Sequence, residues 1–456
     1  MELGLGLSEI LVIPLYLAGM LAVVLTLFYR IEIGLFFLIP FLSNQNILNY
    51  VNDLPLGKDI NDLLFMAMLV RWVIDKQKSK ESLFVKTPLN IPIFLFIIWT
   101  FIEIWWGAMY FGEPIQFTLE NDRIVYWKNL IRVPLLYLIV VNNIKDTNHK
   151  KLIILLMILA ILMIDRGFYN IARWRDFSHY SDQQKIGGLD QGLGGNELAV
   201  FFAMYVVVIL SLFLYTRSIS IKLFLSLPIV ATFYCILFLF SRSGYLAAFV
   251  GCGVIGFLKD KKVFIALIVL VFAWQSLLPI AVQERIEMTK DGEDYDGTVM
   301  QRFEFWEFGS DIISSSPILG AGIIAAYRFN ITAEGFEGRV WHSFHNAYLQ
   351  QAVETGLVGL AIYMWIFLLM ILAGWQLYKS SDDWFDKALG LGLLACVMAC
   401  LAGNIAGGYW NYIGVVSYMY ILAGLVMESI LHIEPKQDTS QAEKETVRKL
   451  RKIGQK

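Results

Sequence analysis

Long apolar segments without polar interruption recur along the whole chain. Several approach the roughly 20 consecutive apolar residues that an α-helix needs to cross the hydrocarbon core of a bilayer. The clearest are Glu9 to Leu27, Ile91 to Phe111, Leu198 to Tyr215 and Val263 to Leu278. Strands of a membrane β-barrel would alternate polar and apolar residues, and these segments do not alternate. The pattern therefore predicts helices that span a membrane.

The apolar segments and their polar flanks predict an all-α fold, a polytopic membrane bundle of about 12–13 transmembrane helices. Their expected ranges are 9–28, 31–42, 60–74, 91–111, 130–142, 152–171, 198–215, 221–240, 243–258, 262–282, 346–377, 387–406 and 411–432. Residues 1–432 then form one integral membrane domain, and residues 433–456 form a polar tail. Segment 283–345 is the one large soluble loop.

Basic residues gather in alternate loops between the predicted helices, and the positive-inside rule makes those loops cytoplasmic. They are Arg71, Lys76, Lys78, Lys80 and Lys86, then Lys145, Lys150 and Lys151, then Arg217 and Lys222, and then Lys259, Lys261 and Lys262. The tail 433–456 falls on the same side. By alternation, segment 283–345 lies on the extracytoplasmic face.

The extracytoplasmic segment is expected to contain a helix from Val299 to Ile313. Val299, Phe303, Trp306 and Ile313 share one stripe of that helix. An apolar stripe of this kind predicts a helix that lies on the membrane surface or closes over a cavity.

Composition agrees with a membrane protein and excludes several other classes. The chain has 456 residues, of which 57% are hydrophobic and 17% charged, and its mean hydropathy is +0.59. A formal net charge of -2 gives no basic excess for nucleic acid. All four cysteines lie in apolar segments, where they are expected to be packing residues. Because Met1 to Ser8 contain no Lys or Arg, the first apolar segment is expected to be retained.

Arg242 interrupts an apolar stretch, between Leu237-Phe238-Leu239-Phe240 and Tyr245-Leu246-Ala247-Ala248. A charge within a membrane helix costs roughly 2.5–3.5 kcal/mol at its centre and less near an interface. A lone arginine of this kind can snorkel to the lipid head groups. It can also bind an anion, because the guanidinium fork matches phosphate oxygens and stays charged when partly buried.

Two further groups in the extracytoplasmic segment have the chemistry of an active site. Arg302 lies one helical turn before Trp306, where it is either a solvated surface arginine or a second anion ligand. The sequence His342-Ser343-Phe344-His345-Asn346 ends the segment. A histidine there is either a loop or capping residue, or a neutral imidazole that takes a proton from a sugar hydroxyl.

Six short motifs occur in order over residues 187–360, and together they resemble the O-antigen ligase and polymerase family. They are Gly195-Asn196-Glu197-Leu198-Ala199, Ser241-Arg242-Ser243-Gly244, Arg302-Phe303-x-x-Trp306, Ser316-Pro317-Ile318-Leu319-Gly320-Ala321-Gly322, His345-Asn346-Ala347-Tyr348-Leu349-Gln350 and Glu354-Thr355-Gly356-Leu357-Val358-Gly359-Leu360. Residues 1–170 resemble the family only as a helical membrane region. The resemblance implies a GT-C-like helical fold.

The resemblance also implies a chemistry for three of these residues. In the family, two arginines are thought to hold the diphosphate of an undecaprenyl-diphosphate glycan, and a histidine is thought to activate the acceptor hydroxyl. Carried over, the catalytic residues are His345, Arg242 and Arg302. Diphosphate departure builds negative charge, which paired guanidinium groups stabilise without a metal or another cofactor. The histidine is expected to work near its ordinary pKa of about 6.5.

Substrate contacts are expected from other residues of the same motifs. These are Asn196, Trp306, His342, Asn346 and Glu354. The implied partners are the undecaprenyl-diphosphate-linked oligosaccharide, a glycan or lipid A-core acceptor, and the lipid bilayer. The implied location is the bacterial inner membrane, with the site on its periplasmic face. The family serves O-antigen ligation, polysaccharide polymerisation and protein glycosylation, and these three stay open.

Several alternative sites remain open at this stage. Asp294-Tyr295-Asp296 is either a divalent metal site or a solvated acidic turn. His342 and His345 have a spacing that two zinc ligands on one helix face can share. Gly320-Ala321-Gly322 lacks the strand and later glycine of a nucleotide site, which favours a sharp turn.

Membrane depth singles out two further candidates. Glu103 is either a proton site or a ligand site, whereas the adjacent Asp165 and Arg166 either neutralise each other or face an interface. A different class of function, a transporter or flippase of lipid-linked or anionic solutes, would predict inverted repeats and broken helices in corresponding halves. The sequence shows no such repeat, and that reading leaves the large one-sided loop unexplained.

Overall fold

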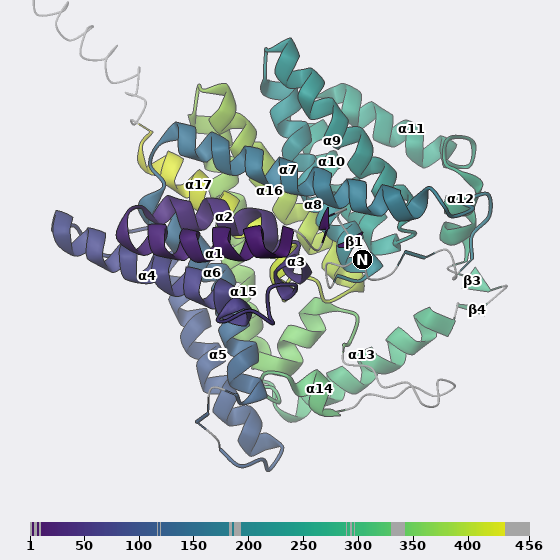
Figure 1. The fold of residues 1–456 in the computed structure, drawn as a ribbon. Coiled ribbons are helices and arrows are strands. Elements are labelled where there is room, and N and C mark those ends of the chain that lie inside the picture. Colours follow the sequence, from purple (N-terminus) through teal and green to yellow (C-terminus); the bar gives the residue numbers. More distant parts are fainter. Residues whose placement is uncertain are drawn as a thin grey trace, which may run out of the picture.

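Helices make up almost all of the regular structure in the computed structural model, which describes residues 2–3, 7–8, 11–115, 117–118, 120–181, 185–186, 193–288, 290–291, 294–295, 297–329 and 343–433. The helices are α1 (Val12–Phe28), α2 (Ile31–Leu42), α3 (Gln45–Asn49), α4 (Ile60–Ser79), α5 (Asn90–Tyr110), α6 (Asp122–Asn143), α7 (Thr147–Ala172), α8 (Gly195–Tyr215), α9 (Ile219–Phe238), α10 (Arg242–Leu258), α11 (Lys261–Leu277), α12 (Ile280–Glu287), α13 (Gly297–Ser315), α14 (Ala325–Phe329), α15 (Ala347–Ser380), α16 (Trp384–Gly403) and α17 (Ile413–Leu431). The short elements are the 3₁₀ turns η2 (Gly57–Asp59) and η4 (Asn404–Ala406) and the hairpins β1 (Glu2–Leu3) with β2 (Leu7–Ser8) and β3 (Lys290–Asp291) with β4 (Asp294–Tyr295). The all-α fold class is confirmed, and every predicted apolar segment contains a helix (Figure 1).

Polar residues at the N-cap position, just before the first helical residue, explain where several long helices begin. The Ser218 hydroxyl accepts from the Ile221 N–H at 3.4 Å to start α9, and the Asn346 side chain accepts from the Leu349 N–H at 3.1 Å to start α15. Asp383 caps α16 in the same way. These side chains satisfy backbone donors that no helical carbonyl can reach.

Eight helices in the described part of the chain are long and apolar enough to cross a membrane, or nine if the bent pair α11 and α12 is one span. The chain is therefore a multi-pass membrane protein. Three more apolar helices, α1, α2 and α10, are shorter than the eight. The expected 12–13 transmembrane helices count these shorter ones, the bent pair and also α4, which is in neither group.

The expected single helix 262–282 is wrong, because the chain bends by 104° between α11 and α12. Leu278 ends α11 in an extended conformation, and Pro279 caps α12. Proline has no N–H for the helical ladder and disfavours helical geometry in the residue before it.

The centre of the bundle consists of α8, α16 and α17, most of whose residues are buried. These helices are apolar all round, which is typical of helices surrounded by other helices. Close approach requires small residues: a Cβ at Gly374 of α15 would lie 2.8 Å from the Gly390 carbonyl oxygen of α16. By contrast, α11 has no buried residue and lies at the periphery (Figure 1).

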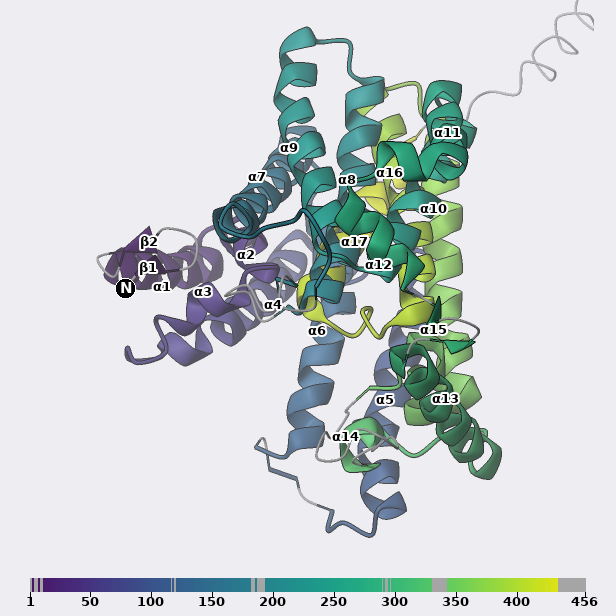
Figure 2. The ribbon, with the colours of Figure 1, turned by 90° about the vertical axis from the view of Figure 1, so that its right-hand side faces the viewer.

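The loops predicted to be cytoplasmic meet at one end of the bundle. Glu81 lies 2.7 Å from the Lys76 ammonium and 3.7 Å from that of Lys145, and Lys150 pairs with Glu428. The turns between α8 and α9 and between α10 and α11 lie together at the top of Figure 2, whereas α13, α14 and the loop after α5 lie at the bottom. The structure thus separates the basic loops from the segment that contains α13.

A break in α15 is filled by the loop that follows α13. Gly356 has φ 65° and ψ 178°, which interrupts the helical hydrogen bond from Leu357 to Val353. The Leu357 N–H instead donates to the Pro317 carbonyl at 2.9 Å, and the Val353 carbonyl accepts from the Ala321 N–H at 2.7 Å. The loop therefore replaces the missing bond within the bundle.

The turn expected at Gly320-Ala321-Gly322 is confirmed, since both glycines have positive φ, 67° and 87°. Gly322 packs directly on α5: a Cβ there would lie 2.1 Å from the Gly107 Cα. Trp106 of α5 also donates to the Gly320 carbonyl at 2.9 Å. Only glycine combines this backbone conformation with so close an approach.

Candidate active site

Arg242 is the first residue of α10, at the end of the bundle opposite the basic loops. Phe240, two residues earlier, has a φ of 53°, which turns the chain sharply between α9 and α10. The Arg285 Nε donates to the Phe240 carbonyl at 3.1 Å and holds this turn. Positive φ in a bulky residue costs energy and is found where the surroundings enforce a functional geometry. The Arg242 side chain is half-buried.

The two serines beside Arg242 connect it to a tyrosine from the far end of the chain. The Ser241 hydroxyl caps α10 and lies 3.0 Å from the Ser243 hydroxyl. Ser243 in turn lies 2.8 Å from the phenol oxygen of Tyr409. Asn404 fixes Tyr409, because its side-chain oxygen accepts from the Tyr409 N–H at 2.7 Å.

His345 lies beneath α13, in the turn that leads into α15. Its backbone φ is 49°, and its N–H donates to the Ser343 hydroxyl at 3.1 Å. The imidazole stacks on Phe305 of α13 at 6.3 Å between ring centroids and 22° between planes. The Trp306 indole N–H donates to the Phe344 carbonyl at 3.1 Å and so holds the same turn against α13.

The buried face of α13 differs from the expected stripe. Phe305 and Ile312 are buried, whereas Phe303 is 42% exposed and Trp306 and Ile313 are half-buried. Gly309 explains why α13 buries this face and not the expected one, because a Cβ there would lie 2.9 Å from Leu349 of α15. The glycine lets this side of α13 approach α15 closely, and that contact selects the buried face.

The structure brings Arg302 and His345 together. The pKa of His345 is lowered to about 4, because burial disfavours the charged imidazole and because the positive charge of Arg302 acts on it. The expectation of an ordinary pKa of about 6.5 is therefore wrong for the protein without substrate. The same Arg302 charge also acts on Tyr409, whose pKa is raised mainly by burial.

Tyr409 thus links the two predicted arginines, because it bonds Ser243, the neighbour of Arg242, and lies within electrostatic range of Arg302. A negative group is close as well. Glu197, in the first turn of α8, raises the pKa of Tyr409 and contributes after burial to the rise of the Tyr412 pKa to about 12. The cluster formed by Arg242, Ser243, Arg302, His345 and Tyr409 therefore draws on four separate parts of the chain.

The other predicted contact residues lie in different settings. Asn346 caps α15, and Trp306 packs beside His345, whereas Asn196 is exposed in α8 and none of its described contacts reaches the cluster. Glu354 is 3% exposed; its carboxyl accepts from Gln350 at 3.3 Å and also bonds the Tyr126 hydroxyl and the Ala326 N–H. His342 lies outside the described residues.

Sequence reasoning missed several members of the cluster. Ser243 lies within the Ser-Arg-Ser-Gly motif and could have been named from it. Tyr409 carries no charge and follows Gly407-Gly408 in a short turn, so no pattern distinguishes it. Gln301 is 5% exposed, and its side-chain NH₂ finds no hydrogen-bond acceptor within the described residues, which leaves a donor next to Arg302.

The described residues give little support to the alternative of a metal site. Within those parts of the chain, no group of three or more His, Cys, Asp or Glu side chains could hold a metal ion. Asp296 and His342 lie outside the described residues. Only the backbone of Asp294 is described, and it pairs with Asp291 in the β3–β4 hairpin.

A comparison with protein families bears on part of this cluster. The family described as O-antigen ligase matches residues 227–364 of the chain. This region of the chain is similar to the O-antigen ligase family. The matched region contains Arg242, Arg302 and His345, but neither Glu197 nor Tyr409. No curated protein matches the chain.

The match indicates the general activity. It supports a membrane glycosyltransferase of the ligase or polymerase type that acts on lipid-linked glycans. The three predicted catalytic residues, which lie in the matched region, come from α10, α13 and the turn before α15. A positively charged, partly desolvated surface of this kind suits a leaving group that gains negative charge.

Proposed function

We propose that the protein transfers a glycan from an undecaprenyl-diphosphate carrier to an acceptor hydroxyl on the extracytoplasmic face of the bacterial inner membrane. The proximity of Arg302 to His345 is the observation that carries this proposal. It places a proton acceptor beside a permanent positive charge, which the attack on the sugar and the departure of a diphosphate both require.

In the proposed reaction, the acceptor oxygen attacks the anomeric carbon of the donor sugar. The new carbon–oxygen bond forms as the bond from that carbon to the diphosphate oxygen breaks, and the electron pair leaves with undecaprenyl diphosphate. The acceptor proton passes to the neutral His345 imidazole. Arg242 and Arg302 hold the diphosphate and balance the charge that develops on it.

The lowered pKa keeps His345 neutral in the substrate-free protein, and it is expected to rise when the donor binds. An imidazole with a pKa of about 4 is neutral at neutral pH, so it can accept a proton but is a weak base. A bound diphosphate would offset the charge of Arg302. The pKa of His345 would then rise toward the operating pH, which makes the base stronger when the donor is in place.

Tyr409 and Ser243 serve this site as positioning residues. Their mutual hydrogen bond of 2.8 Å joins the turn after η4 to the first turn of α10, where Arg242 begins. Gln301 offers a further donor from the same helix as Arg302. The loop between α13 and α14 fastens this assembly to α15 through the bonds at Pro317 and Ala321.

The test is transfer by the purified protein in detergent or nanodiscs. Undecaprenyl-diphosphate oligosaccharide and candidate acceptors are supplied without nucleotide, with and without a chelator, and products are separated by size. We expect transfer by the wild type in the presence of chelator. His345→Ala, Arg242→Ala and Arg302→Ala should each lose at least about a hundredfold in rate, because a positioned base contributes roughly 10²–10⁴-fold.

A matched control is Arg173→Ala, an exposed arginine at the end of α7 that stacks on Trp174. It should transfer at the wild-type rate. Undiminished transfer in the three site variants would remove the assignment of these residues, and loss of transfer with chelator would revive a metal at Asp294 and Asp296. A ladder of products would indicate polymerisation, whereas one shifted acceptor would indicate ligation to lipid A core or to a protein serine.

A further inference from the structure

A groove of about 530 Å³ lies between α7 and α9, away from the active-site cluster. Its walls are mostly carbon, and the side chains of Leu227 and Val230 on its rim are 62% and 68% exposed. In a membrane protein, an apolar groove with so exposed a rim faces lipid rather than water. The groove is therefore shaped for a lipid chain.

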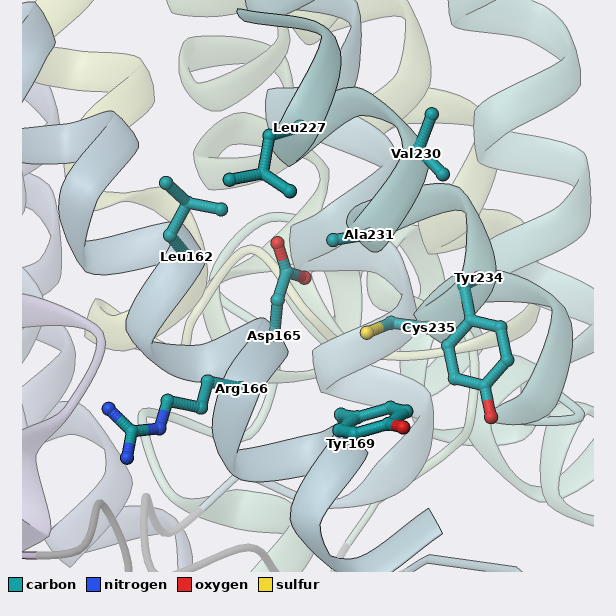
Figure 3. A pocket seen from close by; sticks show the side chains of 9 residues that line it. All are labelled: Leu162, Asp165, Arg166, Tyr169, Leu227, Val230, Ala231, Tyr234 and Cys235. Atoms are coloured by element: carbon teal, nitrogen blue, oxygen red, sulfur yellow. The ribbon is translucent and has the colours of Figure 1, made fainter. Parts of the chain in front are cut away.

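A carboxyl group lies at the bottom of this groove. Asp165 is 3% exposed, and one of its oxygens accepts from the Thr232 hydroxyl at 3.0 Å. The Cys235 thiol is a second, weak donor to this carboxyl, and Oδ1 has no hydrogen-bond partner of good geometry among the described residues. Figure 3 shows the carboxyl turned into the space between Leu227 and Ala231. A buried acceptor at membrane depth is costly unless a donor reaches it, so the occupant of the groove is expected to carry one.

The neighbouring arginine does not supply that donor. Figure 3 shows the Arg166 guanidinium directed away from the Asp165 carboxyl, although both residues line the groove. Arg166 is exposed, and it has no carboxylate partner in the described part of the chain. The two adjacent charges therefore do not neutralise each other, which was one of the two alternatives for this pair. Each is available for a different group of one ligand.

The groove also has a polar end and an apolar end. Arg166, Tyr169 and Tyr234 line one end, and Leu162, Leu227 and Val230 line the other, with Asp165 between them (Figure 3). Tyrosines gather where the bilayer interface begins, and arginine reaches toward phosphates from the same depth. The arrangement fits an amphiphile whose head group lies near Arg166 and whose chain follows α9.

We propose that this groove binds a phospholipid with a primary ammonium head group. The ammonium N–H donates to Asp165 Oδ1, the phosphate pairs with Arg166, and an acyl chain lies along Leu227 and Val230. A purely anionic lipid has no ammonium for Asp165 and places negative charge beside it. A choline head group has the positive charge but no N–H to donate. This site is separate from the proposed glycan transfer and does not depend on it.

The test compares phosphatidylethanolamine with phosphatidylcholine of the same acyl chains, bound to the full-length protein and measured by native mass spectrometry. Phosphatidylglycerol is the anionic probe. The wild type should retain phosphatidylethanolamine at least about fivefold better than either of the other two. Asp165→Asn keeps the shape and removes the charge, and it should abolish the preference over phosphatidylcholine.

Arg166→Gln should weaken retention of both zwitterionic lipids alike, and the control Arg173→Gln, at the end of the same helix, should change neither. Equal retention of the three lipids by the wild type, or a preference that survives in Asp165→Asn, would overturn the proposal.

Should Asp165→Asn fail to fold, phosphatidylethanolamine with a photoreactive acyl chain is crosslinked to the wild type instead. Crosslinks within α7 and α9 that excess phosphatidylethanolamine removes and phosphatidylcholine does not would support the site. Their absence would contradict it.

Discussion

Arg302 and His345 enter the site from either side of the loop between α13 and α15, and the Arg302 charge helps to lower the pKa of the His345 imidazole to about 4. In the proposed reaction the arginine therefore has two roles. It offers a positive charge for the leaving diphosphate, and it keeps the base unprotonated until that diphosphate binds.

Replacement of Arg302 should raise the pKa of His345. In Arg302→Gln the charge is gone but burial remains, so the pKa should move up from about 4 toward the ordinary value without fully reaching it. Acylation by diethyl pyrocarbonate requires a neutral imidazole, and peptide mass spectrometry can follow it at each histidine. Wild-type His345 should stay reactive as the pH falls to about 4, and the variant should lose reactivity at a higher pH.

His179 is the internal control for this titration. It is exposed, and its pKa is raised because the Glu284 carboxylate hydrogen-bonds the imidazole at 2.7 Å. As the pH falls, His179 should become protonated first and lose reactivity first. Equal midpoints for the two histidines would contradict the arrangement around His345.

The bond between Tyr409 and Ser243 should matter as a unit. Tyr409→Phe and Ser243→Ala each remove the same 2.8 Å hydrogen bond, worth about 1 kcal/mol, so each should lower kcat/KM for transfer roughly fivefold. The double variant should be little worse than either single one, because the interaction is already lost. Tyr378→Phe, which removes a 2.9 Å bond to the Leu258 carbonyl at the opposite end, should leave transfer unchanged. Fully additive losses would mean that the two side chains act independently.

Gly322 and Gly112 form a matched pair for the close approach of the loop to α5. Both have positive φ, 87° and 64°, but a Cβ would lie 2.1 Å from the Gly107 Cα at position 322 and would meet nothing within 4 Å at position 112. Gly112→Ala should cost about 1–2 kcal/mol, the conformational penalty alone. Gly322→Ala adds about 1–3 kcal/mol of overpacking. Thermal unfolding in detergent measures both, and equal shifts in Tm would argue against the close contact.

The pair Lys150 and Glu428 ties α7 to α17 among the basic loops. Both side chains are buried, and Lys150 also donates to the Ser429 hydroxyl at 2.8 Å. Lys150→Met leaves the buried Glu428 carboxylate with only the exposed His432 beside it, and should cost about 3–5 kcal/mol in unfolding free energy. Adding Glu428→Gln should recover part of that loss. If the double variant is no more stable than Lys150→Met, the two residues are not coupled.

The site was predictable in part. Arg242, Arg302 and His345 stand out because charged and titratable groups are rare beside apolar segments, and the order of the motifs around them is informative. Tyr409 and Ser243 are ordinary residues in the sequence, and Glu197 is a single acid at the start of a helix. Only the tertiary structure places them near one another: the Asn404 side chain accepts from the Tyr409 N–H, and the Tyr409 hydroxyl bonds Ser243.

The helices themselves are determined locally. Membrane insertion depends on the hydropathy of about 20 consecutive residues, and capping depends on the first few, so each apolar segment could be recognised without knowledge of the others. Pro279 carried a signal for the bend between α11 and α12 that the apolar pattern concealed.

Contacts between distant segments were decided by the tertiary structure alone. The face that α13 buries depends on Gly309 meeting Leu349, and the gap in α15 at Gly356 is filled by a loop that begins near Pro317. The pKa of His345 depends on how far α13 excludes water and on where Arg302 lies. A sequence fixes the polarity and length of each helix, but desolvation and electrostatic distance are properties of the packed structure.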